Sequence, residues 1–227
     1  MSVSGTVDFF YKEALRLGYV ARSAFKLLQI QKQHNLILPG ASVLDLGCAP
    51  GAWLQVACQH LGPLEKGGSV VGVDVKKVKV PSAYCDARVR TISTNVLSLL
   101  RDQARNLSPE GKGFSVVLSD MCPSISGITT KDAALSFELG CQAFSLAIGK
   151  IDYLGEYDVP MYDDNGSGIL RTGGNLVVKF LESEDAQGFG KSCKSNFSKV
   201  SWLRPKATRS SSREIYLICQ GLRRSKF

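Results

Sequence analysis

Apolar segments of strand length alternate with segments of helical periodicity along most of this chain. Strands are expected at 42–46, 69–74, 88–93, 114–120, 175–180, 199–203 and 214–220. Helical patterns lie at 52–61 and 132–148, and in the second Phe137, Cys141, Phe144 and Ile148 recur on one face. This alternation predicts an α/β fold with a mostly parallel sheet and helices on both faces. The short connection between the last two strands indicates an antiparallel C-terminal edge.

Length and composition indicate one globular domain. The chain has 227 residues, of which 44% are hydrophobic, so it can bury a substantial core. We expect a single domain over 1–227 with a helical N-terminal extension at 1–40, an acidic surface insertion at 152–172 and a basic C-terminal segment at 186–227. The insertion holds five acidic residues against Arg171 alone, and its glycines and proline predict a long loop or hairpin.

Basic residues are concentrated near the C-terminus. The whole chain has a net charge of +8, whereas 186–227 alone holds ten Lys or Arg and one acid, Glu214. This asymmetry points to a polyanionic partner, nucleic acid before membrane, although a basic surface that only maintains solubility fits the charge equally well. No apolar run approaches the roughly 18 to 20 residues of a membrane-spanning helix.

The cysteines and the N-terminus bear on the cellular compartment. Seven cysteines, an odd number without a C-x-x-C pair, argue against a disulfide framework and against a zinc site. They favour an intracellular reducing compartment. The first 20 residues have no apolar secretory core and carry acids too early for a good transit peptide. The cytoplasm and an organelle such as the mitochondrion both remain open.

A glycine-bearing turn follows the first predicted strand. Residues 43–53, VLDLGCAPGAW, read as a buried strand, a turn and a helix, in which Gly47 and Gly51 allow a ligand close to the backbone. The G-x-G-x-x-G and G-x-x-x-x-G-K-[ST] patterns that cradle phosphates are absent. A cofactor without phosphates fits better, and S-adenosylmethionine is the evident candidate. Asp74 could bind its ribose and Asn95 its adenine, although each alone is more ordinarily a strand-end or turn residue.

Four ionisable residues stand beside apolar runs, where solvated surface charges are not expected: Lys26, Asp120, Lys179 and Glu214. With the segments RSAFKL at 22–27, APGAW at 49–53, SDM at 119–121 and SREIY at 212–216, they make the chain resemble the FtsJ-type family of RNA 2′-O-ribose methyltransferases. The resemblance implies a Rossmann-like class I methyltransferase fold and a catalytic Lys-Asp-Lys-Glu set formed by these four residues. It also implies an S-adenosylmethionine pocket lined by Gly47, Pro50, Gly51, Trp53, Asp74, Asn95 and Asp120.

The chemistry of a ribose hydroxyl explains why such residues are needed. A 2′-hydroxyl is a poor nucleophile at neutral pH, so methyl transfer needs in-line positioning and a group that takes or orients the proton. We assign this role to Lys179, whose pKa should be lowered by burial and by the ammonium of Lys26. Asp120 and Glu214 should hold the two amines in place. Neither zinc nor magnesium has an evident role.

The RNA substrate is predicted by analogy with the family. The compact domain and the segment at 22–28 most resemble members that act on a uridine of large-subunit ribosomal RNA, free or within a ribosomal particle, with tRNA as the alternative. Two features depart from the family pattern. Asn95 stands where bacterial members have Asp, and Cys122-Pro123-Ser124 replaces the usual Ala-Pro-Asn on the substrate side.

Two other classes of function share parts of this pattern. A nicotinamide-dependent oxidoreductase would share the sheet, but it requires the absent G-x-G-x-x-G turn. A catalytically silent RNA-binding or ribosome-assembly protein would keep the basic segment, but it would not need the four ionisable residues. We therefore favour an enzyme, which we expect to be a monomer.

Overall fold

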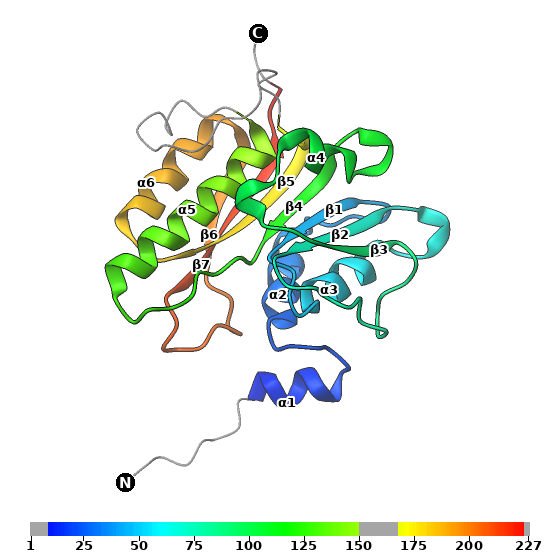
Figure 1. Ribbon diagram of the computed structural model, residues 1–227, viewed down its shortest axis with the longest axis horizontal. Helices are drawn as coiled ribbons and strands as arrows, with labels where there is room; N and C mark the ends of the chain where they lie inside the picture. The colour runs from blue at the N-terminus through cyan, green and yellow to red at the C-terminus, as the bar shows by residue number, and fades with distance from the viewer. Residues whose placement is uncertain (1–8, 150–167, 225–227) are drawn as a thin grey trace.

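The computed structural model describes residues 9–149 and 168–224, which form a seven-stranded sheet with helices on both faces (Figure 1). The strands are β1 (Ser42–Leu46), β2 (Ser69–Asp74), β3 (Val89–Ser93), β4 (Phe114–Ser119), β5 (Leu170–Leu181), β6 (Phe197–Leu203) and β7 (Glu214–Leu222). The α-helices are α1 (Phe9–Arg16), α2 (Ala24–His34), α3 (Ala52–His60), α4 (Arg101–Asn106), α5 (Thr129–Ile148) and α6 (Glu184–Ser192).

The sheet is mostly parallel. Its strand order is β3-β2-β1-β4-β5-β7-β6, in which the first five strands are parallel to their neighbours. β7 is antiparallel to both β5 and β6, so it lies one place in from the edge. The predicted α/β fold and its antiparallel C-terminal strands are confirmed. The strand order reverses between β1 and β4, where open α/β sheets bind ligands at the carboxyl ends of the strands.

Two apolar layers cover the sheet. On one face, α5 buries Phe137, Cys141 and Phe144, and α6 adds Phe189. On the other face, the cluster includes Leu27 of α2 and Leu54 of α3. Figure 1 shows α5 and α6 on the face opposite to α2 and α3. Central strands such as β1, in which every residue is buried, require this cover on both faces.

Several predicted boundaries differ from the structure. β5 begins at Leu170, five residues earlier than predicted, because its first part pairs with Phe114 before a register shift. The predicted acidic loop at 152–172 therefore ends before Leu170, and its residues up to 167 lie outside the described residues. The short helices α4 and α6 were not predicted. The single domain over 1–227 stays a prediction. Within the described ranges, no helix is long and apolar enough to cross a membrane.

Candidate active site

The four ionisable residues singled out in the sequence meet at the carboxyl edge of the sheet. Lys26 Nζ lies 2.5 Å from Glu214 Oε2. Lys179 Nζ lies 3.1 Å from Asp120 Oδ1 and 3.8 Å from Glu214 Oε1, and it donates a hydrogen bond to the backbone carbonyl of Asp120 at 2.6 Å. The two ammonium groups and two carboxylates thus alternate in one cluster, with Glu214 shared between the two lysines.

Strand register explains why three of these residues converge. Lys179 of β5 pairs directly with Tyr216 of β7, and Leu181 pairs with Glu214. Residues two apart on a strand face the same side of the sheet, so Glu214, Tyr216 and Lys179 share one face. Asp120 follows β4, the parallel neighbour of β5, and its N–H bonds to the carbonyl of Leu46.

Lys26 reaches the cluster from α2, which packs on the same face of the sheet. Its own helix buries Ala24, Leu27 and Ile30, and Lys26 is only 8% exposed. A lysine that is buried to this extent needs a charged partner, which Glu214 provides. Lys179 is 5% exposed and has the same need, so both lysines depend on the two carboxylates.

Tyr216 joins the cluster, although the sequence analysis did not select it. Its hydroxyl donates a hydrogen bond of 2.8 Å to Asp120 Oδ1, and its ring packs against Trp53 with centroids 5.8 Å apart. Burial raises the pKa of Tyr216 well above 10, so the hydroxyl stays protonated and remains a donor. Tyr216 therefore holds the Asp120 carboxylate in place. Two sequence signals could have identified it, its position two residues after Glu214 and its place in the segment SREIY at 212–216.

The charge state of Lys179 differs from the prediction. Burial alone would lower the pKa of Lys179, but the nearby charges of Asp120 and Glu214 outweigh it and the pKa is raised above 10.5. The ammonium of Lys26, which was expected to lower this pKa, is not among the groups that shift it, and it is paired with Glu214. Lys179 is consequently an ammonium in the resting site, and the expectation of a lowered pKa was wrong.

A cavity of about 580 Å³ opens beside this cluster, between the ends of β1, β2 and β4. This volume lies within the range of small-molecule and cofactor sites. Of the predicted cofactor residues, Gly47, Asp74, Asn95 and Asp120 line it. Cys122, Pro123 and Ser124, the residues that depart from the family pattern, line it as well. Asp120 thus belongs to the charged cluster and to the cavity wall.

The turn after β1 keeps the cavity open. At Gly47, where φ is +77°, an added Cβ would lie 2.8 Å from the Met121 side chain, so a larger residue would force Met121 to move. Asp74 Oδ2 accepts a hydrogen bond from the Ala49 N–H at 3.0 Å and fixes this turn. Asn95 lines the cavity, and its side-chain oxygen also accepts from the N–H of Leu97 at 3.0 Å. Asn95 therefore both lines the cavity and bonds within its own turn.

Three of the predicted cofactor residues do not line the cavity. Trp53 is 2% exposed and donates its indole N–H to the carbonyl of Ser23 at 3.0 Å, so it supports Tyr216 from behind. Gly51 is the N-cap of α3, with φ of +112°, and it packs on Pro81, which a Cβ there would approach to 2.8 Å. Pro50 follows a cis peptide bond and is exposed. These three residues shape the turn and pack behind it. They can therefore belong to the sequence motif without contacting a ligand.

A buried carboxylate next to the cavity has no hydrogen-bond partner among the described residues. Asp45 of β1 is fully buried, and neither of its side-chain oxygens is bonded. Burial raises the pKa of Asp45 well above 3.8, and the negative charges of Asp120 and Asp74, which line the cavity, raise it further. Such a group needs a partner when it is ionised.

The raised pKa of Asp45 predicts how stability depends on pH. The folded state keeps the proton above pH 3.8 while the unfolded state loses it, so stability should fall as pH rises from about 4 through the folded pKa. The slope is at most about 1.4 kcal/mol per pH unit. Urea unfolding between pH 4 and 8 should show Asp45→Asn gaining stability relative to the wild type as pH rises. Parallel curves for the two proteins would contradict this, and Asp102→Asn on the exposed side of α4 serves as the control.

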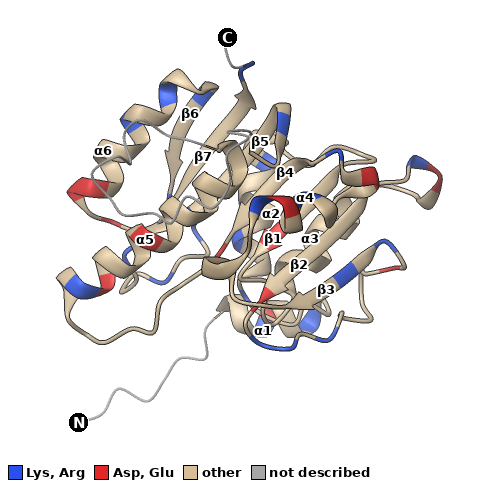
Figure 2. Cartoon of the chain, turned by 45° about the horizontal axis from the view of Figure 1, so that its top comes forward, with Lys and Arg blue, Asp and Glu red and all other residues tan. Residues whose placement is uncertain are grey.

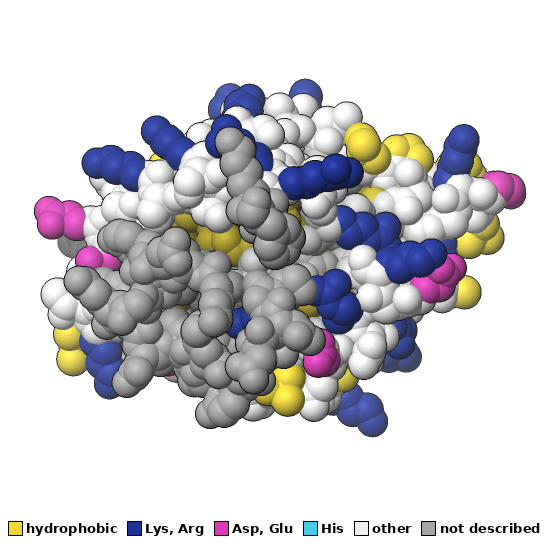
Figure 3. Space-filling view, turned by 90° about the horizontal axis from the view of Figure 1, so that it is seen from above, with side chains coloured by type: hydrophobic (Ala, Val, Ile, Leu, Met, Phe, Trp, Pro, Cys, Tyr) yellow, Lys and Arg dark blue, Asp and Glu magenta, His cyan; other side chains and the backbone are white. Residues whose placement is uncertain are grey.

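The basic C-terminal segment does not form one surface. Four basic residues lie in the loop between β6 and β7, on the edge of the sheet that carries the charged cluster: Arg204, Lys206, Arg209 and Arg213. Lys191 is in the last turn of α6, and Arg223 follows β7, both toward the opposite edge. Figure 2 shows the Lys and Arg positions spread over several elements, and Figure 3 shows many of them around the rim of the opposite edge.

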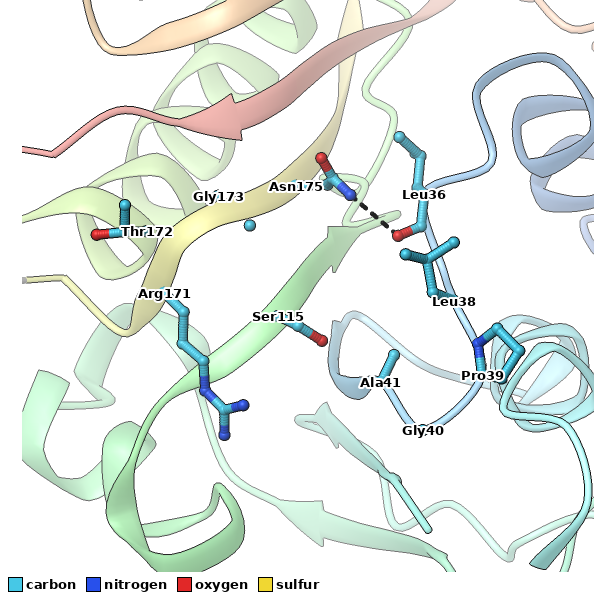
Figure 4. Close-up of a pocket in the computed structure, with 11 residues that line it drawn as sticks. Leu36, Leu38, Pro39, Gly40, Ala41, Ser115, Arg171, Thr172, Gly173 and Asn175 are labelled. Atoms are coloured by element: carbon cyan, nitrogen blue, oxygen red, sulfur yellow. Dashed lines mark hydrogen bonds between the residues drawn. The ribbon is translucent and has the colours of Figure 1, made fainter. Parts of the chain in front are cut away.

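A separate hollow of about 330 Å³ lies at that opposite edge (Figure 4). It is bordered by the start of β5 and the loop before β1, which are joined by a 3.0 Å hydrogen bond from Asn175 to the carbonyl of Leu36. Among the described residues, Arg171 is the only charged one in its lining, and none of the four clustered residues reaches it. The described part of its lining therefore offers no group suited to acid–base chemistry. Within the described ranges, no group of side chains is suited to hold a metal ion.

Comparisons with known proteins agree on one family. Residues 19–222 match the family model described as FtsJ-like methyltransferase. The chain is 36% identical over 220 residues to ribosomal RNA large subunit methyltransferase E of Syntrophobacter fumaroxidans, with 96% of this chain and 97% of the relative covered. It is 35% identical over 214 residues to the protein of that name from Desulfosudis oleivorans, with 94% and 89% covered.

Solved structures show the same fold. A crystal structure from Plasmodium falciparum, described as a ribosomal RNA methyltransferase, superposes with a TM-score of 0.65 at 21% identity and covers 90% of this chain and 98% of its own. A Lactococcus lactis protein described as a hemolysin superposes with a TM-score of 0.56 at 18% identity, covering 89% and 88%. At these identities the likeness concerns the fold alone.

Proposed function

Because this chain belongs to the FtsJ-like methyltransferase family, we propose that it transfers a methyl group from S-adenosylmethionine to a ribose 2′-hydroxyl of large-subunit ribosomal RNA. The observation that carries the proposal is the cluster of Lys26, Asp120, Lys179 and Glu214, which opens through Asp120 onto the cofactor-sized cavity. A binding protein without activity would not need two buried lysines and two carboxylates at this position.

The residues around the cavity fit S-adenosylmethionine. Bound there, it would supply the methyl group from a positively charged sulfonium. We assign Asp74 to its ribose hydroxyls, since a carboxylate that already accepts two hydrogen bonds has further acceptor capacity. We assign Gly47 to close contact through its backbone. Asn95 would face the adenine with its amide group.

The charged cluster is proposed to act on the hydroxyl. In its neutral form, the amine of Lys179 would contact the 2′-hydroxyl and accept its proton as that oxygen forms a bond to the methyl carbon. The bond between the methyl carbon and the sulfonium sulfur would break, and the sulfur would leave as a neutral thioether. Asp120 holds the amine of Lys179 at 3.1 Å and is itself oriented by Tyr216. Glu214 joins Lys179 to Lys26, so the position of the amine is fixed from two sides. Oriented groups of this kind lower the barrier by positioning and by proton transfer.

Transfer of labelled methyl groups tests the function directly. The protein is incubated with labelled S-adenosylmethionine and large-subunit rRNA, ribosomal particles or tRNA, and any product is mapped for 2′-O-methylation. We expect label in large-subunit rRNA at one nucleotide. Label only in tRNA would identify the tRNA alternative. Binding of cofactor and RNA without any transfer would favour a catalytically silent assembly factor and would overturn the proposal.

The raised pKa of Lys179 predicts the pH dependence of the reaction. Only the neutral amine can accept a proton, and below its pKa the neutral fraction rises tenfold per pH unit. With both substrates saturating, the rate of the chemical step should therefore rise about tenfold per unit between pH 7 and pH 9, without a plateau. The measurement is single-turnover transfer across this range, with folding checked at each pH. A flat profile would mean that the ammonium of Lys179 only orients the hydroxyl.

A further inference from the structure

Two large apolar side chains are exposed on the loop that leads from the charged cluster to α5. This loop covers residues 122–128, between β4 and α5, and we refer to it as the isoleucine loop. Ile125 is 61% exposed and Ile128 is 58% exposed. Holding both in water costs free energy that a ligand covering them would recover. Apolar side chains that gather at one place on a surface mark interaction sites.

The isoleucine loop starts at the proposed reacting centre. Residues 122–124 line the cofactor cavity directly after Asp120, which belongs to the charged cluster. Burial raises the pKa of the Cys122 thiol, and the charges of Lys179 and Glu214 also shift it, so the thiol lies beside the cluster. In Figure 1 the loop lies at the same end of the strands as the loop between β6 and β7. The two isoleucines thus follow directly on residues that would adjoin the reacting ribose.

A buried carboxylate fixes the shape of the isoleucine loop. Asp132 of α5 is 5% exposed and accepts hydrogen bonds from the Ser126 N–H at 2.8 Å, the Ser126 hydroxyl at 2.7 Å and the Gly127 N–H at 3.1 Å. The Ser126 oxygen accepts from the N–H of Ile128 at 3.2 Å. The bonds from Ser126 lower the pKa of Asp132, so the carboxylate stays ionised at neutral pH. A loop held in this way loses little entropy when a ligand binds.

The two ends of the charged cluster differ in polarity. The Lys26–Glu214 end borders a hollow of about 260 Å³ whose described lining is entirely charged or hydroxyl-bearing: Arg22, Lys26, Arg209, Ser212 and Glu214. The Asp120 end borders the cavity that leads to the isoleucine loop. A nucleotide whose 2′-oxygen lies at Lys179 carries its base on the neighbouring ribose carbon, so the base must lie near one of these ends. Because the faces of a base are weakly polar, the isoleucine end suits them better.

We propose that the isoleucine loop binds the base of the nucleotide whose ribose is methylated, an inference that rests on the proposed function. One face of the base packs against the exposed isoleucine side chains. A base drawn out of its RNA stack loses contact with its neighbours, and contact with protein side chains replaces part of that stacking. Because every base has such a face, the contact positions the ribose without reading the sequence.

The first test removes the base and the isoleucines in combination. An rRNA fragment that contains the mapped nucleotide is compared with the same fragment in which hydrogen replaces that base, and equilibrium binding is measured without cofactor. Wild type should bind the abasic fragment about tenfold more weakly. The Ile125→Ser/Ile128→Ser double variant should bind both fragments equally. Both positions are exposed, so the substitutions should leave the fold intact.

Matched variants control for a general loss of apolar surface. Leu64 is 60% exposed in the 3₁₀-helix Leu64–Lys66, which precedes β2 at the opposite edge of the sheet. Leu64→Ser should therefore keep the wild-type difference between the two fragments. Ile125→Leu/Ile128→Leu, which retains apolar side chains, should keep it as well. A double serine variant that still discriminates against the abasic fragment like wild type overturns the proposal, and so does a wild type that binds both fragments equally.

Crosslinking tests the contact without methyl transfer. The fragment carries 4-thiouridine in place of its uridines, and irradiation joins each such base to the side chains that touch it. The tryptic peptide 113–131, which contains the isoleucine loop, should be crosslinked in wild type and not in the double serine variant. Absence of this peptide from the wild-type products would contradict the proposal.

The outcomes separate the two proposals. If wild type transfers no methyl group to RNA, the proposed function fails, and the crosslink still decides whether RNA bases contact the isoleucine loop. If wild type methylates rRNA but removal of the isoleucines leaves the effect of the base unchanged, the base assignment is wrong and the proposed function stands.

Discussion

Replacing Lys179 by methionine or alanine should lower methyl transfer to ribosomal RNA by about a thousandfold. The amine of Lys179 is the group we assign to the hydroxyl proton, and removal of such a group typically costs about 10² to 10⁴ in rate. Methionine retains most of the volume, so the loss would reflect the missing amine and not a new cavity. The measurement is single-turnover transfer, which reports the chemical step without product release.

Cofactor binding distinguishes this result from a damaged fold. Lys179 does not line the cavity, so calorimetric binding of S-adenosylmethionine to Lys179→Met should stay within a few-fold of wild type. Asp120 keeps its hydrogen bond from Tyr216 in the variant, which limits the loss of structure around it. Lys199→Met, on an exposed position of β6, is the matched control and should transfer methyl groups normally. Wild-type rates in Lys179→Met would end the role assigned to this lysine.

The sheet could be predicted because its strands carry a strong local signal. The predicted and observed bounds coincide for β1 and β2, which are mostly apolar and, apart from the two ends of β2, buried. The start of β5 was missed because Thr172, Gly173 and Gly174 have the composition of a turn. In the structure these residues accompany the register shift against β4, a property of two strands together that one segment does not reveal.

The residues of the charged cluster could be predicted from the sequence, but the direction in which the pKa of Lys179 is shifted could not. The apolar neighbours of Lys179 and Asp120 marked them as buried charges, which are rare without a function. The pKa of Lys179 depends on distances to Asp120 and Glu214 that only the folded chain sets. Tyr216 was missed because a tyrosine in an apolar strand has the pattern of a core residue, and its hydrogen bond to Asp120 spans 96 positions.

The motif around the glycine turn shows a different limit of sequence reasoning. Gly47 and Asp74 lie at the cavity, whereas Trp53 lies behind the charged cluster. The motif contains every residue that the turn needs, including residues such as Trp53 that pack behind the turn and do not line the cavity. Trp53, through its contact with Tyr216, affects the orientation of Asp120 and belongs to the site in that indirect sense.

Removing the charge of Glu214 should have the second large effect. Glu214 is the carboxylate that both lysines share, and its side chain is 17% exposed. In Glu214→Gln, Lys26 loses its ion pair and two buried ammonium groups are left with Asp120 alone. Breaking a buried pair in this way costs roughly 3 kcal/mol of stability. Methyl transfer should fall by about a hundredfold near pH 7, since the amine of Lys179 is no longer held from both sides.

The pH dependence of Glu214→Gln identifies the cause of that loss. Burial alone would raise the pKa of Glu214, but Lys26 and Lys179 outweigh it and the pKa lies below 4.5. The contribution of Glu214 to stability is therefore present above about pH 4.5 and lost as pH falls through the folded pKa, so the deficit of the variant should shrink in acid.

The same substitution changes the pKa of Lys179. Without Glu214, one of the charges that raise this pKa is gone, so the rise of kcat with pH should shift to lower pH in the variant. Urea unfolding and the pH–rate profile of Glu214→Gln together check both effects, with Glu184→Gln on the first turn of α6 as the control. A variant that is destabilised but keeps the wild-type pH–rate profile would show that Glu214 only supports the fold. A shifted profile would show that Glu214 sets the basicity of Lys179, which is the property that the proposed reaction requires.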